Sequence, residues 1–194
     1  MFSTVTELSE QTNINLKSID ILITNYSMFS PTPSLSAVVV NEFNMRSNIM
    51  SFNLSGMGCS AGIGSVGLAK DLLKVHRDCL ALIVSIEMLN EYWYTGKNHS
   101  MLLSNCPFRL GGAAMLFSSR NQDNKIAKYE LKHLVTTSKA CDDQSYACVF
   151  LDIDMEGKSG ISISKSMVNV AEKALKANMA SLGLRFLPFK VHYR

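Results

Sequence analysis

The first half of the chain alternates between helical and extended patterns of hydrophobic positions. Val5 to Thr12 has the spacing of a short amphipathic helix, and Ile19 to Thr24 is an apolar run typical of a buried strand. Ser34 follows a proline-rich turn and can cap a helix that runs to about Arg46. Ile49 to Leu54 predicts a second strand.

Ser60 to Val75 predicts a further helix, and Cys79 to Met88 predicts a third strand. This strand is rich in Leu, Ile and Val at every position, which is typical of a central strand whose two faces are both covered. Strands and helices that alternate in this way imply a parallel sheet with right-handed crossovers. We therefore expect an α/β fold.

The second half is more antiparallel in character. Gly111 to Phe117 and Ala127 to Thr137 predict two strands joined through Asn121 to Asn124, and Tyr146 to Ile153 is a candidate third strand. Met167 to Met179 predicts a final amphipathic helix. The sheet is thus expected to be mixed but mostly parallel.

Composition and charge exclude several classes of protein. Hydrophobic residues make up 47% of the 194 residues and charged residues 18%, which excludes a disordered chain. A net charge of +3 with scattered Lys and Arg argues against a nucleic-acid partner. The longest apolar run, Leu80 to Val84, is far shorter than the roughly 20 residues of a membrane span, and no signal peptide is expected at the N-terminus.

The five cysteines show no CxxC pair and no zinc-ligand spacing. A disulfide framework and a metal site are therefore not expected, and no cofactor is predicted. Cys79, Cys106, Cys141 and Cys148 are interpreted as buried or half-buried thiols of a reducing compartment. Cys59 is the exception.

Cys59 lies in the segment from Gly56 to Gly62, where a strand ends and a helix begins. Glycines on both sides permit a tight turn that presents the side chain at the edge of the sheet. The N–H groups at the start of a helix favour a thiolate and can stabilise an oxyanion. Several small residues follow in the helix, which predicts close packing and hence a buried nucleophile helix.

Two other interpretations of this segment stay open on the residues alone. The same stretch satisfies G-x-S-x-G, which would make Ser60 the nucleophile of a serine hydrolase. The chain offers four histidines as the base, His76, His99, His133 and His192, and none has a persuasive context. The third interpretation is a glycine-rich turn that carries an idle cysteine.

The surroundings of the segment resemble a known family. Beside Gly56 to Gly62, the matching stretches are Asn25, Ser27, Phe29 with Pro31 to Ala37, Leu68 to Leu73, Trp93-Tyr94, Ser100 to Cys106, Phe108-Arg109, Gly112 to Ala114, and Ala140 with Asp142 and Asp143. Together these resemble the plant 3-ketoacyl-CoA synthases, the condensing enzymes of very-long-chain fatty acid elongation in the thiolase-like superfamily. The resemblance runs from about Phe2 to Pro188.

The resemblance implies residues 1–188 as the N-terminal half of a thiolase-like condensing domain, with 189–194 as a divergent tail. It implies an acyltransferase in which Cys59 takes an acyl group from acyl-CoA as a thioester, which malonyl-CoA then attacks after losing CO2. CoA thioesters are thus the implied substrates. A homodimer or association with full-length relatives, and an endoplasmic reticulum membrane location, are implied in the same way.

The sequence departs from the family in its other catalytic motifs, in its membrane helices and at several single positions. Its second-half histidine and asparagine motifs and its two N-terminal membrane helices have no counterpart here. Ser138 stands where the family usually has histidine, and Tyr26, Ser55 and Leu184 also depart from the pattern. We therefore expect a truncated form that cannot condense by itself, or a catalytically silent interaction fragment.

Overall fold

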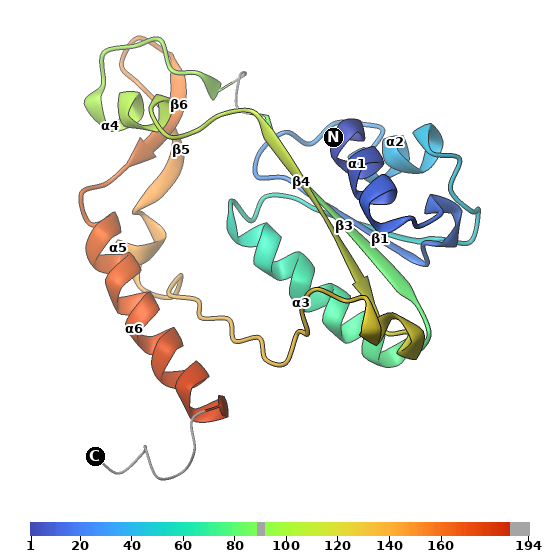
Figure 1. The fold of residues 1–194 in the computed structure, drawn as a ribbon. Coiled ribbons are helices and arrows are strands. Elements are labelled where there is room, and N and C mark those ends of the chain that lie inside the picture. Colours follow the sequence, from blue (N-terminus) through green and yellow to red (C-terminus); the bar gives the residue numbers. More distant parts are fainter. Residues whose placement is uncertain (89–91, 187–194) are drawn as a thin grey trace. The chain divides into compact units, whose positions relative to one another are not determined.

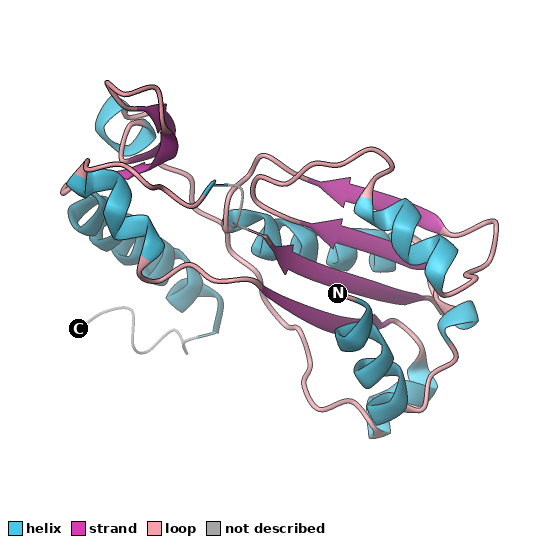
Figure 2. Ribbon diagram, turned by 90° about the horizontal axis from the view of Figure 1, so that it is seen from above, coloured by secondary structure: helices cyan, strands magenta, loops and turns pink. Residues whose placement is uncertain are grey.

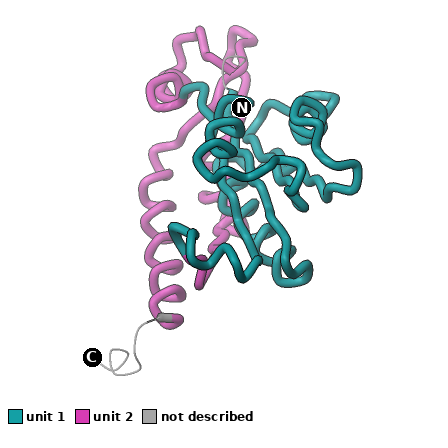
Figure 3. The backbone as a smooth tube through the Cα atoms, turned by 45° about the vertical axis from the view of Figure 1, so that its right-hand side comes forward, with its two compact units in different colours: residues 1–90, 109–129 teal, residues 91–108, 130–194 magenta. Residues whose placement is uncertain are grey.

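The computed structural model describes residues 1–88 and 92–186. The chain forms two compact units (Figure 3), one made of Met1–Asn90 with Arg109–Tyr129 and the other of Glu91–Phe108 with Glu130–Arg194. The predicted tail, 189–194, lies outside the described residues, and the assignment of 1–188 to one condensing-domain half stays a prediction.

The first unit contains the predicted α/β arrangement. Its elements are α1 (Phe2–Thr12), η1 (Leu16–Ser18), β1 (Ile21–Asn25), α2 (Leu35–Glu42), β2 (Met50–Leu54), α3 (Ser60–Val75), β3 (Leu80–Glu87), β4 (Gly111–Ser118) and η4 (Asn121–Lys125). The Ser34 hydroxyl caps α2 as predicted, because it accepts a hydrogen bond from the Ala37 amide at 3.2 Å.

The four strands form one sheet in the order β2-β1-β3-β4. β1 lies between β2 and β3 and is parallel to both, with Ile21 opposite Met50 on one side and Ala81 on the other. β4 is antiparallel to β3 and closes that edge. The prediction of a mixed, mostly parallel sheet is confirmed.

The sheet is covered on both faces (Figures 1 and 2). α1 and α2 lie on one face, where Leu22 and Leu82 contribute to a cluster that includes Val5 of α1 and Val39 of α2. α3 lies on the other face, where Ile21, Ile23, Ala81 and Ile83 pack with Ala69. Successive residues of β1 and β3 point to opposite faces, so the continuous apolar runs in the sequence supply both layers.

A buried carboxylate joins several segments at the amino edge of this sheet. Asp20 is 7% exposed. Its carboxylate contacts Arg46 at 2.8 Å and Arg120 at 3.3 Å, and it accepts a hydrogen bond from the Leu80 amide at 2.7 Å. These contacts connect the starts of β1 and β3 with the residues after α2 and β4, at the end of the sheet opposite the start of α3.

Among the described residues, the predicted nucleophile helix α3 is buried along one side. Its buried residues are Ala61, Ser65 and Ala69, which form a single stripe. Ile63 is 53% exposed, and a Cβ atom placed on Gly62 would meet no heavy atom within 4 Å. The small residues therefore let one side of α3 approach the sheet, and the other side is open among the described residues.

The second unit is built around a two-stranded hairpin. Its elements are α4 (His99–Leu102), η3 (Leu103–Asn105), α5 (Asp143–Tyr146), β5 (Val149–Ile153), β6 (Ser159–Ile163) and α6 (Met167–Phe186). β5 and β6 are antiparallel. Tyr94 is 1% exposed and donates a hydrogen bond to Asp154 at 2.5 Å. Gly160 is required there, because a Cβ atom would lie 2.8 Å from the Tyr94 ring.

One predicted strand did not form, and one strand of the second unit was missed. Ala127 to Thr137 is an extended segment without strand pairing, and β6 was not predicted. A strand needs a partner as well as an alternating pattern, and the Val135 carbonyl instead accepts a hydrogen bond from the Asn178 amide at 2.9 Å. The final helix was predicted correctly but extends to Phe186.

Candidate active site

The turn between β2 and α3 has the backbone that its glycines predict. Gly56 has φ 71° and Gly58 has φ 57°, in the left-handed region that residues with a Cβ rarely adopt. No heavy atom lies within 4 Å of a Cβ built on either residue. The glycines are therefore required by backbone conformation and not by crowding.

Cys59 is the residue at which the turn becomes a helix. It is the N-cap of α3, with φ −61° and ψ −17°, and no side chain caps the helix at this position. The thiol belongs to an exposed residue. The Ala61 amide donates a hydrogen bond to the Gly58 carbonyl at 3.1 Å. A helix N-terminus in general carries partial positive charge, because its first N–H groups lack acceptors in a preceding turn. The position predicted for Cys59 is confirmed, and its catalytic role stays a prediction.

Ser60 does not meet the requirements of a hydrolase nucleophile within the first unit. Its hydroxyl donates a hydrogen bond to the Met57 carbonyl at 2.5 Å. His76, the only histidine among the described residues of this unit, ends α3, where its amide donates to the Leu72 carbonyl at 2.8 Å. A 16-residue helix is about 24 Å long, so no histidine of this unit can serve Ser60 as a base.

Polar side chains at the carboxyl edge of the sheet were largely missed by sequence reasoning. Thr24 and Asn25 end β1 and are 0% and 4% exposed, and Asn53 lies near the end of β2. Glu87, at the end of β3, accepts a hydrogen bond from the Ser27 amide at 2.8 Å. The available signal was the change from apolar to polar residues at the same end of each parallel strand.

The remaining cysteines differ from the prediction in part. Cys79 and Cys148 are half-buried as expected, whereas Cys106 and Cys141 are exposed. Burial raises the pKa of the Cys79 thiol, and the nearby Asp20 carboxylate adds to this shift. Cys106 follows the short η3 turn and Cys141 precedes α5, and the sequence gives no pattern that distinguishes covered from open turns.

Other polar residues singled out in the sequence belong to the second unit. His99 begins α4 and His133 lies in the extended segment, both exposed. Asp142 caps α5 by accepting hydrogen bonds from the Ser145 hydroxyl and amide at 2.7 and 3.0 Å, which lower the pKa of its carboxyl group. Ser138 accepts a hydrogen bond from the Ala140 amide at 3.4 Å.

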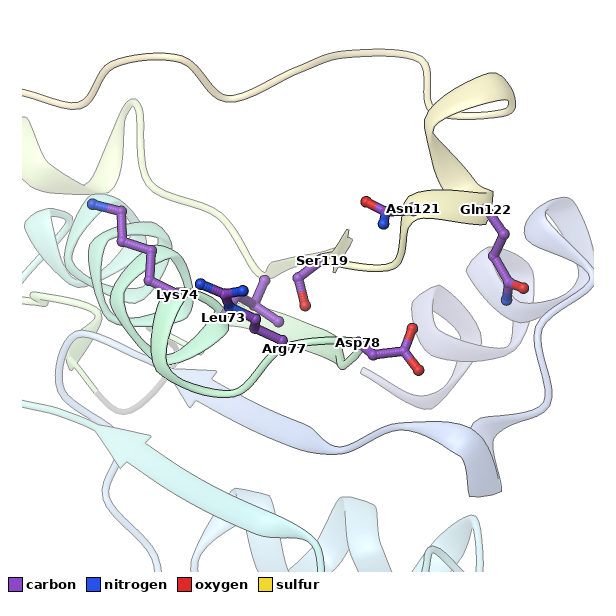
Figure 4. A pocket seen from close by; sticks show the side chains of 7 residues that line it. All are labelled: Leu73, Lys74, Arg77, Asp78, Ser119, Asn121 and Gln122. Atoms are coloured by element: carbon purple, nitrogen blue, oxygen red, sulfur yellow. The ribbon is translucent and has the colours of Figure 1, made fainter.

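An open depression of about 680 Å³ lies at the other end of α3 from Cys59 (Figure 4). Its lining contains none of the predicted site residues and consists of Leu73, Lys74, Arg77, Asp78, Ser119, Asn121 and Gln122. Over the described parts of the chain, 1–88 and 92–186, no group of three or more His, Cys, Asp or Glu side chains could hold a metal ion. Within the same residues no helix has the length and apolar character to cross a membrane.

Comparison with known proteins identifies relatives of this chain. A family model described as FAE1/Type III polyketide synthase-like protein matches residues 1–194. "Probable 3-ketoacyl-CoA synthase 21" of Arabidopsis thaliana is 57% identical over 189 residues, and "3-ketoacyl-CoA synthase 7" of the same plant is 51% identical over 189 residues. Each alignment covers 97% of this chain, which spans only 41% of either relative.

Solved structures show the same fold. Germicidin synthase from Streptomyces coelicolor, a type III polyketide synthase, matches with a TM-score of 0.82 at 19% identity, over 96% of this chain and 48% of that chain. OleA from Xanthomonas campestris matches with a TM-score of 0.70 at 20% identity, over 93% of this chain and 55% of that chain. The predicted thiolase-like fold is confirmed.

Proposed function

Because the chain belongs to the FAE1/type III polyketide synthase-like family, we propose that it is the nucleophile-bearing part of a very-long-chain 3-ketoacyl-CoA synthase, with Cys59 as the acyl acceptor. The observation that supports this role is the place of Cys59, exposed at the first turn of α3 after a glycine turn. A thiol so placed is accessible to a thioester and close to helix N–H groups.

The proposed chemistry begins with attack of the Cys59 thiolate on the carbonyl carbon of a long-chain acyl-CoA. The bond between that carbon and the CoA sulfur breaks, and the CoA thiolate leaves and takes up a proton. Helix N–H groups can stabilise the oxyanion of the tetrahedral intermediate. Malonyl-CoA then loses CO2, and its carbanion attacks the Cys59 thioester to give a 3-ketoacyl-CoA and the free thiol. No resident cofactor is needed for these steps.

Condensation with malonyl-CoA, the second step of the reaction, needs groups beyond those near Cys59 in the first unit. A chain that spans 41% of its relatives supplies the acyl acceptor, and we propose that further residues of a complete synthase stabilise the malonyl-derived carbanion. Association as a homodimer or with a full-length relative, and action at the endoplasmic reticulum membrane, belong to this proposal.

Acyl loading tests the proposed function. Purified chain is incubated with a long-chain acyl-CoA, and the CoA thiol that is released is measured with a thiol reagent after the protein has been removed. We expect up to about one equivalent of CoA per chain, none with Cys59→Ser, and an unchanged amount with Cys106→Ser, which alters another exposed thiol. Equal release by wild type and Cys59→Ser would overturn the proposal.

A catalytically silent interaction fragment is the second candidate, because α6 exposes an apolar row. Val168, Leu175 and Met179 follow one another along one side of the helix and are between 55% and 70% exposed. A row of this kind on a helix marks a surface that associates with another protein. The acyl-loading assay separates the candidates, since a silent fragment releases no CoA.

A further inference from the structure

Two residues of the polar edge of the sheet contact the strand that leads into the nucleophile turn. Asn53 and Leu54 are the last two residues of β2, and Cys59 follows five residues after Leu54. Thr24 and Tyr26, at and just after the end of β1, lie beside them. In a parallel pair the two strands end at the same edge of the sheet, so residues after β1 can contact the end of β2.

Three hydrogen bonds connect these residues. The Thr24 hydroxyl donates to the Asn53 carbonyl oxygen Oδ1 at 2.5 Å, and the Asn53 amide Nδ2 donates to the Tyr26 hydroxyl. The Tyr26 backbone amide donates to the Leu54 carbonyl at 3.2 Å. Tyr26 is 1% exposed, so its ring is fixed by packing. The end of β2 is thus held by both the backbone and the side chain of Tyr26.

The turn is tied to the start of α3 by two hydrogen bonds, from the Ser60 hydroxyl to the Met57 carbonyl at 2.5 Å and from the Ala61 amide to the Gly58 carbonyl at 3.1 Å. Both of its glycines have open space where a Cβ would be. Its conformation is therefore fixed from its two ends, by α3 on one side and by Asn53 and Leu54 on the other. Displacement of a reacting group by about 1 Å can cost about a hundredfold in rate. The hydrogen bonds of Thr24 and Tyr26 to Asn53 and Leu54, here called the anchor, therefore help to determine the position of Cys59.

We propose that Tyr26 and Asn53 are positioning residues: the hydrogen bond between them fixes the direction in which the nucleophile turn leaves the sheet and holds Cys59 at the start of α3. This proposal rests on the proposed function, because a fixed place for Cys59 serves catalysis only if Cys59 is the acyl acceptor. Cys59 is already exposed, so a looser turn cannot improve access to it and only removes its fixed place beside the helix N–H groups.

The same edge offers a matched control. Asn25 donates a hydrogen bond from Nδ2 to the Ser85 hydroxyl at 2.8 Å, which joins β1 to β3 on the side away from β2. Ser85→Ala removes a partly buried side-chain hydrogen bond of similar kind without touching β2. It therefore reproduces a general loss of stability while leaving the anchor of the nucleophile turn intact.

The experiment compares alkylation rates within one sample. Wild type, Tyr26→Phe, Asn53→Leu and Ser85→Ala react with iodoacetamide under native conditions, and peptide mapping gives separate rates for Cys59, Cys106 and Cys141. We expect Tyr26→Phe and Asn53→Leu to slow Cys59 about threefold to tenfold, the effect of one lost hydrogen bond, with the two reference thiols within about twofold. Ser85→Ala should leave Cys59 within about twofold of wild type. Tyr26→Phe keeps the buried ring, so a folded variant is available.

Several outcomes would overturn the proposal. These are an unchanged or faster Cys59 in both Tyr26→Phe and Asn53→Leu, a parallel change at all three thiols, or an equal loss in Ser85→Ala. Failure of wild type to release CoA in the acyl-loading assay would refute the proposed function instead, and the ratio of alkylation rates would still decide whether the anchor positions Cys59.

Discussion

At the residue scale, Cys59 should be the most reactive of the five thiols. It is exposed to the reagent at the N-terminus of α3, beside the first N–H groups of the helix. Cys106 and Cys141 are exposed on short turns, and burial raises the pKa of Cys79 and so lowers its thiolate fraction at neutral pH. Limiting iodoacetamide followed by peptide mapping checks this order, and preferential labelling of Cys106 or Cys141 would contradict it.

The position of Cys59 could be predicted from the sequence because its cause is local. A strand, two glycines with positive φ and a helix start are adjacent in the chain. The contact between Tyr26 and Asn53 could not be predicted, because it joins residues 27 positions apart. It depends on the pairing of β1 with β2 and on the direction of a tyrosine side chain.

At the scale of elements, α3 should tolerate change on one side only. Ala69 is fully buried against the sheet, and Ala69→Leu should destabilise the first unit by about 1–3 kcal/mol through overpacking. Ile63 is 53% exposed, and Ile63→Ser should change the free energy of unfolding by no more than about 0.5 kcal/mol. Urea denaturation followed by circular dichroism measures both. A similar loss for both variants would indicate that the outer side of α3 is covered.

One predicted strand that did not form and one strand that was not predicted show what periodicity cannot supply. The alternation in Ala127 to Thr137 defines two faces, yet no strand of the described chain pairs with it. Ser159 to Ile163 becomes β6 although it is short and polar, because Val149 to Ile153 lies opposite it and Gly160 leaves room for Tyr94. Pairing and close packing are properties of the fold and leave little trace in a five-residue pattern.

The second unit should lose stability in acid through Asp154. The hydrogen bond from the Tyr94 hydroxyl, followed by those from the Lys158 and Glu156 amides, lowers the pKa of this carboxyl group below its ordinary value of about 3.9. The unfolded chain therefore binds the proton first, so this contribution is present above about pH 4 and is lost as the pH falls through the lowered pKa.

Asp154→Asn and Tyr94→Phe should each lower stability at pH 7 and flatten its decline between about pH 5 and pH 3, since both remove the interaction between the carboxylate and the hydroxyl. Fluorescence of Trp93, the one tryptophan of the chain, reports urea unfolding of this unit. Variants with the same acid-dependent decline as wild type would show that this contact does not shift the carboxyl group.

At the scale of the whole molecule, the 194-residue chain should form no 3-ketoacyl product by itself. Condensation needs a nucleophile, an oxyanion site and a group that stabilises the malonyl-derived carbanion in one pocket. Cys59 and the start of α3 offer the first two, and the one described histidine of their unit, His76, ends the same helix about 24 Å away. The assay supplies long-chain acyl-CoA and labelled malonyl-CoA. Product well above a Cys59→Ala control would show that other residues of the chain complete the site.

The central claim is that Cys59 carries the acyl group, and mass spectrometric mapping of the acylated chain tests it most directly. After incubation with long-chain acyl-CoA and digestion at mildly acidic pH, fragment ions locate the added mass. We expect it on Cys59, removable by neutral hydroxylamine as a thioester is, and absent from Cys59→Ala. An acyl group on Ser60 that resists neutral hydroxylamine, or one spread over Cys106 and Cys141 and unaffected by Cys59→Ala, would contradict the account.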